Sequence, residues 1–203
     1  MIDRKVFWVG VVVLALAVLV AVVPWKRTYE FRGALIDPPQ PAPQIGLTDV
    51  NGRLFDLRAW RGDIVLLTFG YTSCPDVCPT TLADLKRLRA ELDADQAARV
   101  QVVFITVDPQ RDTPERVQEY VSFFDPTFIG LSGSEEDLAP VWQAYGVFRE
   151  VGERNAEGGY AVNHSARIYL VDPDGNLRLT YSFGTDPQDI LRDVRYLLSA
   201  EAG

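Results

Sequence analysis

Short apolar runs alternate along the chain with segments whose apolar residues recur at helical spacing. The runs 64–69 and 100–107 are rich in branched residues and have the length of buried strands. Two later strands, 168–171 and 177–181, are joined by an Asp-Pro-Asp-Gly-Asn turn. After the first run, leucines fall on one helical face: Leu82, Leu85, Leu88 and Leu92. This alternation predicts an α/β domain.

Three further helices are predicted from their starts or from an apolar face. Thr113 and Pro114 are typical of an N-cap followed by the first helical residue. Ser134 and Asp137 resemble a capping box, although Glu or Gln is more usual at the second position. The last helix, 186–199, has one apolar face.

Smaller elements complete the predicted sheet. A short strand is expected at 128–131, and two more at 45–48 and 54–57 around an Asn-Gly turn. Residues 147–163 are polar and contain glycines, which predicts a loop or an irregular hairpin. The order of elements predicts parallel pairing early in the sheet and an antiparallel hairpin late.

The beginning of the chain has the pattern of a membrane anchor. Residues 6–23 carry no charge, and this length is near the lower limit for a helix that spans a bilayer. Trp8 and Trp25 lie near its two ends, as in an aromatic belt. A cleaved signal peptide is the alternative, but its apolar core is normally shorter. Both interpretations place the following domain on the extracytoplasmic, periplasmic-type side.

A proline-rich stretch follows, and it is predicted to be an extended, semi-rigid tether. The predicted organisation is therefore an anchor helix with its flanks at 1–28, the tether at 29–43 and one domain at 44–203. Of the 203 residues, 47% are hydrophobic and 24% charged, which is ordinary for a globular protein. The net charge of −8 argues against nucleic-acid binding, because phosphate recognition needs a basic face.

The chemistry of the chain centres on its two cysteines, Cys74 and Cys78, which are separated by three residues. They lie in the turn between the first buried strand and the leucine-rich helix, with Cys78 at or next to the helix N-terminus. Unpaired N–H groups and the helix dipole favour a thiolate there. A dithiol in such a turn can carry out redox chemistry or bind a soft metal.

His164 is the only histidine, and it precedes a predicted strand. Alone it could equally be an exposed or a core residue. Together with Cys74 and Cys78 it offers two sulfurs and one nitrogen. Thiolates suit Cu(I) and Zn(II), whereas structural zinc requires four ligands, so three ligands favour copper, as Cu(I) or Cu(II).

Several other side chains are candidates for a supporting role in this site. Asp108 and Asp172 lie at strand ends, where they could line the site or simply bond their own turns. Asp76, between the cysteines, could tune a thiol pKa or orient the turn. The aromatic candidates for shielding a metal, which core packing would explain equally well, are Tyr71, Phe148 and Tyr160.

With these residues in hand, the chain resembles the Sco/SenC family of membrane-tethered copper proteins. The matching segments are 69–82, with Cys-Pro-Asp-Val-Cys-Pro, 107–115, with Asp-Pro-Gln-Arg-Asp, and 163–175, with Asn-His-Ser and Asp-Pro-Asp-Gly. One departure is Asp63, where the family often has lysine. The resemblance implies a thioredoxin-like fold with inserted elements, and it implies Cys74, Cys78 and His164 as copper ligands.

The resemblance also implies the duty of the site, which is to help assemble the dinuclear copper centre of cytochrome c oxidase. The expected partner is the copper-site subunit of the oxidase, with another copper carrier or a thioredoxin-like reductase as further partners. The alternative is a thiol-disulfide oxidoreductase that keeps the oxidase's copper-ligand cysteines reduced, with Cys74 and Cys78 as its redox-active pair. A peroxidase-like enzyme and a purely structural disulfide have less support from the residues.

Overall fold

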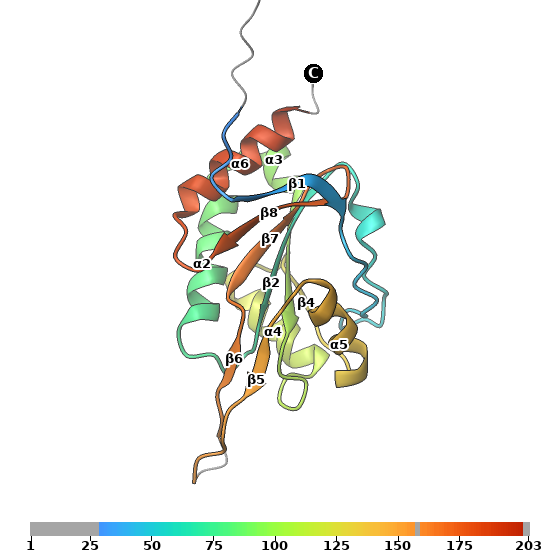
Figure 1. Ribbon diagram of the computed structural model, residues 1–203, viewed down its shortest axis with the longest axis vertical. Coiled ribbons are helices and arrows are strands. Elements are labelled where there is room, and N and C mark those ends of the chain that lie inside the picture. Colours follow the sequence, from blue (N-terminus) through green and yellow to red (C-terminus); the bar gives the residue numbers. More distant parts are fainter. Residues whose placement is uncertain (1–28, 157–158, 201–203) are drawn as a thin grey trace, which may run out of the picture. The chain divides into compact units, whose positions relative to one another are not determined.

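A mixed sheet forms the centre of the domain (Figure 1). The computed structural model describes residues 29–156 and 159–200, and in that part the sheet has six strands in the order β1-β8-β7-β2-β3-β4. A separate two-stranded hairpin, β5–β6, extends from one end. The strands are β1 (Ala34–Pro41), β2 (Ile64–Gly70), β3 (Val100–Thr106), β4 (Ile129–Leu131), β5 (Arg149–Val151), β6 (Val162–His164), β7 (Arg167–Val171) and β8 (Asn176–Ser182).

Helices cover both faces of the sheet. They are the 3₁₀-helix η1 (Leu57–Trp60), α2 (Val77–Ala90), α3 (Ala94–Ala98), α4 (Pro114–Phe124), α5 (Glu135–Ala144) and α6 (Pro187–Ala200). One core cluster packs α2, α4 and α6 against one face of the sheet. The other packs α5 and the chain between β1 and β2 against the opposite face. Figure 1 shows α2 and α6 on one side of the strands and α5 on the other.

Strand direction decides which loops meet at the functional end of the sheet. β2 runs parallel to β3, and β3 runs parallel to β4. β7 is antiparallel to both β2 and β8. The carboxyl ends of β2 and β3 therefore share an edge with the amino end of β7. The cysteine turn, the loop after β3 and His164 consequently lie at the same edge.

The predicted α/β class is confirmed, and so are its early parallel pairs and its late antiparallel hairpin. The helix starts are also confirmed. The Thr113 side chain accepts from the Arg116 amide, with Pro114 in the first turn. Ser134 and Asp137 form a reciprocal capping box. The polar stretch before His164 adopts the hairpin alternative, and α3 is an element that the sequence patterns did not predict.

The predicted tether was wrong for residues 34–41, because they form β1 at the sheet edge, antiparallel to β8. Prolines lack an amide donor and are tolerated at edges and bulges. Pro38 and Pro39 fall where the pairing with β8 shifts register, between Leu35 and Gln40. The compact unit accordingly begins at Phe31.

The strands expected at 45–48 and 54–57 were also wrong as extended elements. Among the described residues they are reduced to one isolated bridge between Thr48 and Leu54. The predicted anchor, residues 1–28, lies outside the described residues. Within 29–156 and 159–200, no helix has both the length and the apolar character that a membrane crossing requires.

Candidate functional site

The two cysteines lie in the turn that joins β2 to α2, as predicted. Gly70 ends β2, and a methyl group at that position would lie 2.6 Å from Cys78 Sγ. The absence of a side chain therefore allows the first turn of α2 to pack directly on the strand. Cys78 is buried, with 4% of its surface exposed, and Cys74 is half-buried. Both are free thiols.

His164 reaches the dithiol from the end of β6. Its Nε2 atom lies 3.9 Å from Cys78 Sγ, and its Nδ1 atom lies 3.2 Å from the Ser165 carbonyl oxygen. A proton on Nδ1 donated to that carbonyl would leave the Nε2 lone pair facing the sulfur. The Tyr71 ring meets the imidazole edge to face at 5.9 Å between centroids.

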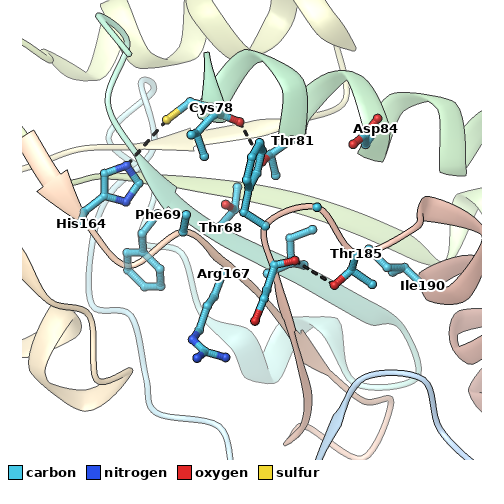
Figure 2. Close-up of a pocket in the computed structure, with 15 residues that line it drawn as sticks. Thr68, Phe69, Cys78, Thr81, Asp84, His164, Arg167, Thr185 and Ile190 are labelled. Carbon is cyan, nitrogen blue, oxygen red and sulfur yellow. Dashed lines mark hydrogen bonds between the residues drawn. The ribbon is translucent and has the colours of Figure 1, made fainter. Parts of the chain in front are cut away.

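Two hollows open beside this arrangement. In Figure 2, Cys78 and His164 face each other at the end of a pocket that continues toward Thr185 and Ile190. A second, more open hollow is lined by Cys74, His164 and the Pro75–Asp76 turn. The imidazole thus borders both hollows, so the dithiol can be approached from outside the domain.

The two thiols differ in protonation. The pKa of Cys74 is lowered from 9.0 to about 3, first by a hydrogen bond from the Cys78 side chain, then by His164 and by backbone amides, against the effect of burial. One of these amides is that of Cys78, 3.5 Å from Cys74 Sγ. The pKa of Cys78 is raised, because its proton is held by the Cys74 thiolate and because it is buried. At neutral pH the site contains one thiolate and one thiol.

The three candidate ligands are close together but are not a preformed metal cluster. Across residues 29–156 and 159–200, no group of three or more His, Cys, Asp or Glu side chains is arranged to hold a metal ion. The structure brings His164 to Cys78 and Cys74 to the amide of Cys78. The ligand role of Cys74, Cys78 and His164 stays a prediction.

Comparison with known proteins identifies the family. The model of the SCO1/SenC family matches residues 37–199. The chain belongs to the SCO1/SenC family.

Individual relatives agree with this assignment. The chain is 40% identical over 176 residues to the mitochondrial SCO2 homolog of Bos taurus. The matched stretch covers 86% of this chain and 65% of the bovine protein. The solution structure of apo Sco1 from Thermus thermophilus matches with a TM-score of 0.71 and 37% identity, over 87% of this chain and 99% of that one. ScoI of Bradyrhizobium japonicum with copper bound matches with a TM-score of 0.69 and 35% identity, over 77% of this chain and 98% of that one. These neighbours support the predicted thioredoxin-like α/β fold.

The other candidate residues of this SCO1/SenC domain do not touch Cys74, Cys78 or His164 in the same way, and Asp172 lies far from them. Asp172 is at the opposite end of the sheet, because β7 runs antiparallel to β2. The adjacent Pro173 carbonyl accepts from Gly62, just before β2, and Asp172 itself accepts from the Asn176 amide. Burial raises the pKa of Asp172. The idea that Asp172 lines the site was therefore wrong, and Asp172 closes its own turn.

Asp108 lies at the functional end, but it is bound by other side chains. It is fully buried, pairs with Arg111 and accepts from the Tyr160 hydroxyl at 2.8 Å. Asp76 occupies the N-cap position of α2 without a capping bond from its side chain. Of the three aromatic candidates, Tyr71 contacts the imidazole, Tyr160 packs on Arg111, and Phe148 is 59% exposed.

Asp112 is a residue that the sequence analysis missed. It is buried, with 1% of its surface exposed. Its carboxylate accepts from the Thr72 amide at 3.0 Å, the Thr72 hydroxyl at 2.6 Å and the Thr106 hydroxyl at 2.7 Å. It thereby fixes the start of the cysteine turn to the end of β3. The available signal was a second aspartate in the loop after a buried strand.

Proposed function

We propose that this chain binds one copper ion on Cys74, Cys78 and His164 and delivers it to the copper-site subunit of cytochrome c oxidase. The observation that carries the proposal is the approach of His164 Nε2 to Cys78 Sγ, 3.9 Å, in the turn where Cys74 Sγ accepts from the Cys78 amide. ScoI of Bradyrhizobium japonicum, at 35% identity, has been solved with copper bound, which supports the same cargo here.

The donor set fits such an ion. Sulfur and imidazole ligands bound at about 2.3 and 2.0 Å to one metal lie about 3.5–3.7 Å apart, so the observed separation needs only a small closure. Thiolates select Cu(I), and imidazole also suits Cu(II). Cys78 must lose its proton when it binds, so uptake releases protons and weakens as the pH falls.

Delivery requires that the ion be transferred to the ligands of a partner, and the two hollows beside the site support this transfer. The hollow beside Cys74 and His164 allows an incoming thiolate or imidazole to reach the ion before the chain's own ligands leave. We also propose that residues 1–28 anchor the domain to a membrane on its extracytoplasmic side, where the oxidase subunit would meet it.

The test is Cu(I) loading of the full chain, with measurement of stoichiometry and affinity. We expect one ion per chain, with loss of binding in the Cys74→Ser, Cys78→Ser variant. His164→Ala should weaken binding strongly, and equal affinity in His164→Ala would remove the histidine from the site. Transfer is then measured by mixing loaded protein with the metal-free, reduced oxidase fragment.

The second candidate function is thiol-disulfide exchange, which the unequal protonation of the two thiols favours. The Cys74 thiolate would attack a partner disulfide, form a mixed disulfide and release one partner thiolate. Cys78 would then lose its proton, attack Cys74 Sγ and release the second thiolate, so two electrons pass to the partner. Reduction of a target disulfide that survives His164→Ala would favour this function over copper delivery.

A further inference from the structure

The hairpin that carries His164 is a small element that needs external support. β5 and β6 have three residues each and pair in the register Arg149–His164, Glu150–Asn163 and Val151–Val162. An isolated two-stranded hairpin is at best marginally stable in water. The position of His164 over the dithiol therefore depends on what attaches this hairpin to the rest of the domain.

One attachment is made by Arg149, the register partner of His164. Its Nε donates to the Val107 carbonyl at 2.5 Å, and its Nη1 pairs with Glu135 at 3.2 Å. The guanidinium also lies over the Trp142 ring, 4.8 Å from its centroid. The side chain is only 14% exposed, although it comes from an exposed hairpin. Arg149 thus joins the base of the hairpin to the end of β3 and to α5.

A second attachment is made by Arg111, which reaches the hairpin from the loop after β3. Its Nη1 donates to the Tyr160 carbonyl at 2.9 Å, and its guanidinium lies 3.7 Å from the centroid of the Tyr160 ring. The Tyr160 hydroxyl in turn donates to Asp108, which also pairs with Arg111. The same guanidinium lies 5.5 Å from the ring of Tyr71, the residue that contacts the imidazole.

The two attachments connect the hairpin and the rest of the domain from both sides. Arg149 extends from the hairpin into the domain, and Arg111 extends from the domain into the hairpin. Both are anchored within residues 107–111, directly after β3. Charged hydrogen bonds that are partly buried are worth more than exposed ones, and cation–π contacts add to them. Neither arginine touches Cys74 or Cys78 in any contact described above.

We propose that Arg111 and Arg149 are positioning residues that clamp the β5–β6 hairpin so that His164 stays within reach of Cys78. The inference rests on the proposed function, since it assigns these residues to the copper site. Residues that orient a metal ligand without touching the metal typically contribute 10- to 100-fold to affinity. Each arginine is expected to act through His164 alone.

The test compares Arg111→Gln, Arg149→Gln and Tyr160→Phe with the wild-type full chain. Tyr160→Phe keeps the ring under Arg111 and removes only the bond to Asp108, so it is the variant least able to disturb folding. The matched control is Arg89→Gln, because Arg89 is also a largely buried arginine, 15% exposed, and pairs with Asp125 away from the site. Cu(I) affinity is measured by competition with a chelator, in the wild-type and in the His164→Ala background.

We expect each arginine variant to weaken Cu(I) binding about 10- to 100-fold in the wild-type background. In the His164→Ala background the same substitutions should change affinity by less than about twofold, because the ligand they position is gone. Tyr160→Phe should show a smaller loss, and Arg89→Gln none. Unchanged affinity in both arginine variants, or equal losses in the two backgrounds, would overturn the clamp.

A second readout does not depend on copper. In the metal-free protein, amide hydrogen exchange across residues 149–156 and 159–164 should accelerate in both arginine variants and remain unchanged in Arg89→Gln. If the wild type bound no copper, the proposed function would fail, and this measurement would still decide whether the arginines hold the hairpin. Exchange at wild-type rates in both variants would refute the inference by itself.

Discussion

The close approach of Cys78 to the end of β2 leads to a quantitative prediction for Gly70→Ala. The added methyl group would lie 2.6 Å from Cys78 Sγ and 2.8 Å from Phe104 Cε2, whereas ordinary contacts begin near 3.4 Å. Phe104 is 1% exposed and Cys78 is 4% exposed, so neither side chain has free space to enter. Overpacking of this kind costs about 1–3 kcal/mol.

Alanine also stabilises a strand relative to glycine by about 0.5–1 kcal/mol, which partly offsets the clash. Gly46→Ala provides the matched control, because a methyl group at Gly46 would have nothing within 4 Å and the backbone there is not left-handed. The free energy of unfolding should therefore be lower in Gly70→Ala than in Gly46→Ala by about 1–3 kcal/mol.

The assay is urea unfolding of the reduced full chain, followed by circular dichroism, with the slope of the transition checked for constancy. Cu(I) affinity is measured on the same samples, since a displaced Cys78 Sγ should also bind the ion more weakly. Equal midpoints and equal slopes for the two alanine variants would show that Cys78 does not pack against Gly70 as described.

Three further predictions concern individual side chains. Because the pKa of Cys74 is lowered to about 3, its alkylation by iodoacetamide should be nearly independent of pH between 5 and 8; a rate that rises tenfold per pH unit would contradict this. Asp112→Asn replaces a carboxylate that accepts three hydrogen bonds, so it should lower the free energy of unfolding by about 1.5–3 kcal/mol in denaturant titration. A loss below about 0.5 kcal/mol would be too small for the removal of these contacts. Asp193→Asn should weaken the attachment of β1, because Asp193 accepts from the Arg32 and Gly33 amides; faster hydrogen exchange across 32–41 is expected, and unchanged exchange would count against it.

The features that the sequence predicted correctly are those set by local periodicity and local caps. The apolar run of β2 is buried at every position, and the Thr113–Pro114 start of α4 has the geometry that its residues prescribe. The β1 strand was missed because local sequence does not reveal long-range pairing. Its prolines are typical of a linker, and only pairing with β8, more than a hundred residues later, makes this stretch part of the sheet.

The candidate site shows the same division. Cys74 and Cys78 were placed correctly because a strand followed by a helix leaves little choice for the turn between them. Asp172 was misplaced because the direction of β7 relative to β2 is set by sheet pairing, which the local sequence does not specify. The roles of Asp112, Arg111 and Arg149 were not predicted, because they depend on partners such as Thr72, Tyr160 and Val107 that lie about 40–50 residues away in the chain.

Strand direction is what joins these observations into one site. If β7 ran parallel to β2, the residue before it would emerge at the far end of the sheet, more than a strand length from the thiols. Because β7 is antiparallel, the chain enters it at the edge where β2 ends, and His164 arrives beside Cys78. The parallel β3 ends at that edge too, and its loop supplies Asp112 for the cysteine turn and Arg111 for the histidine hairpin. The loop after β3 thus holds both the cysteine turn, through Asp112, and the histidine hairpin, through Arg111. A change in this loop should therefore alter the distance between Cys78 Sγ and His164 Nε2.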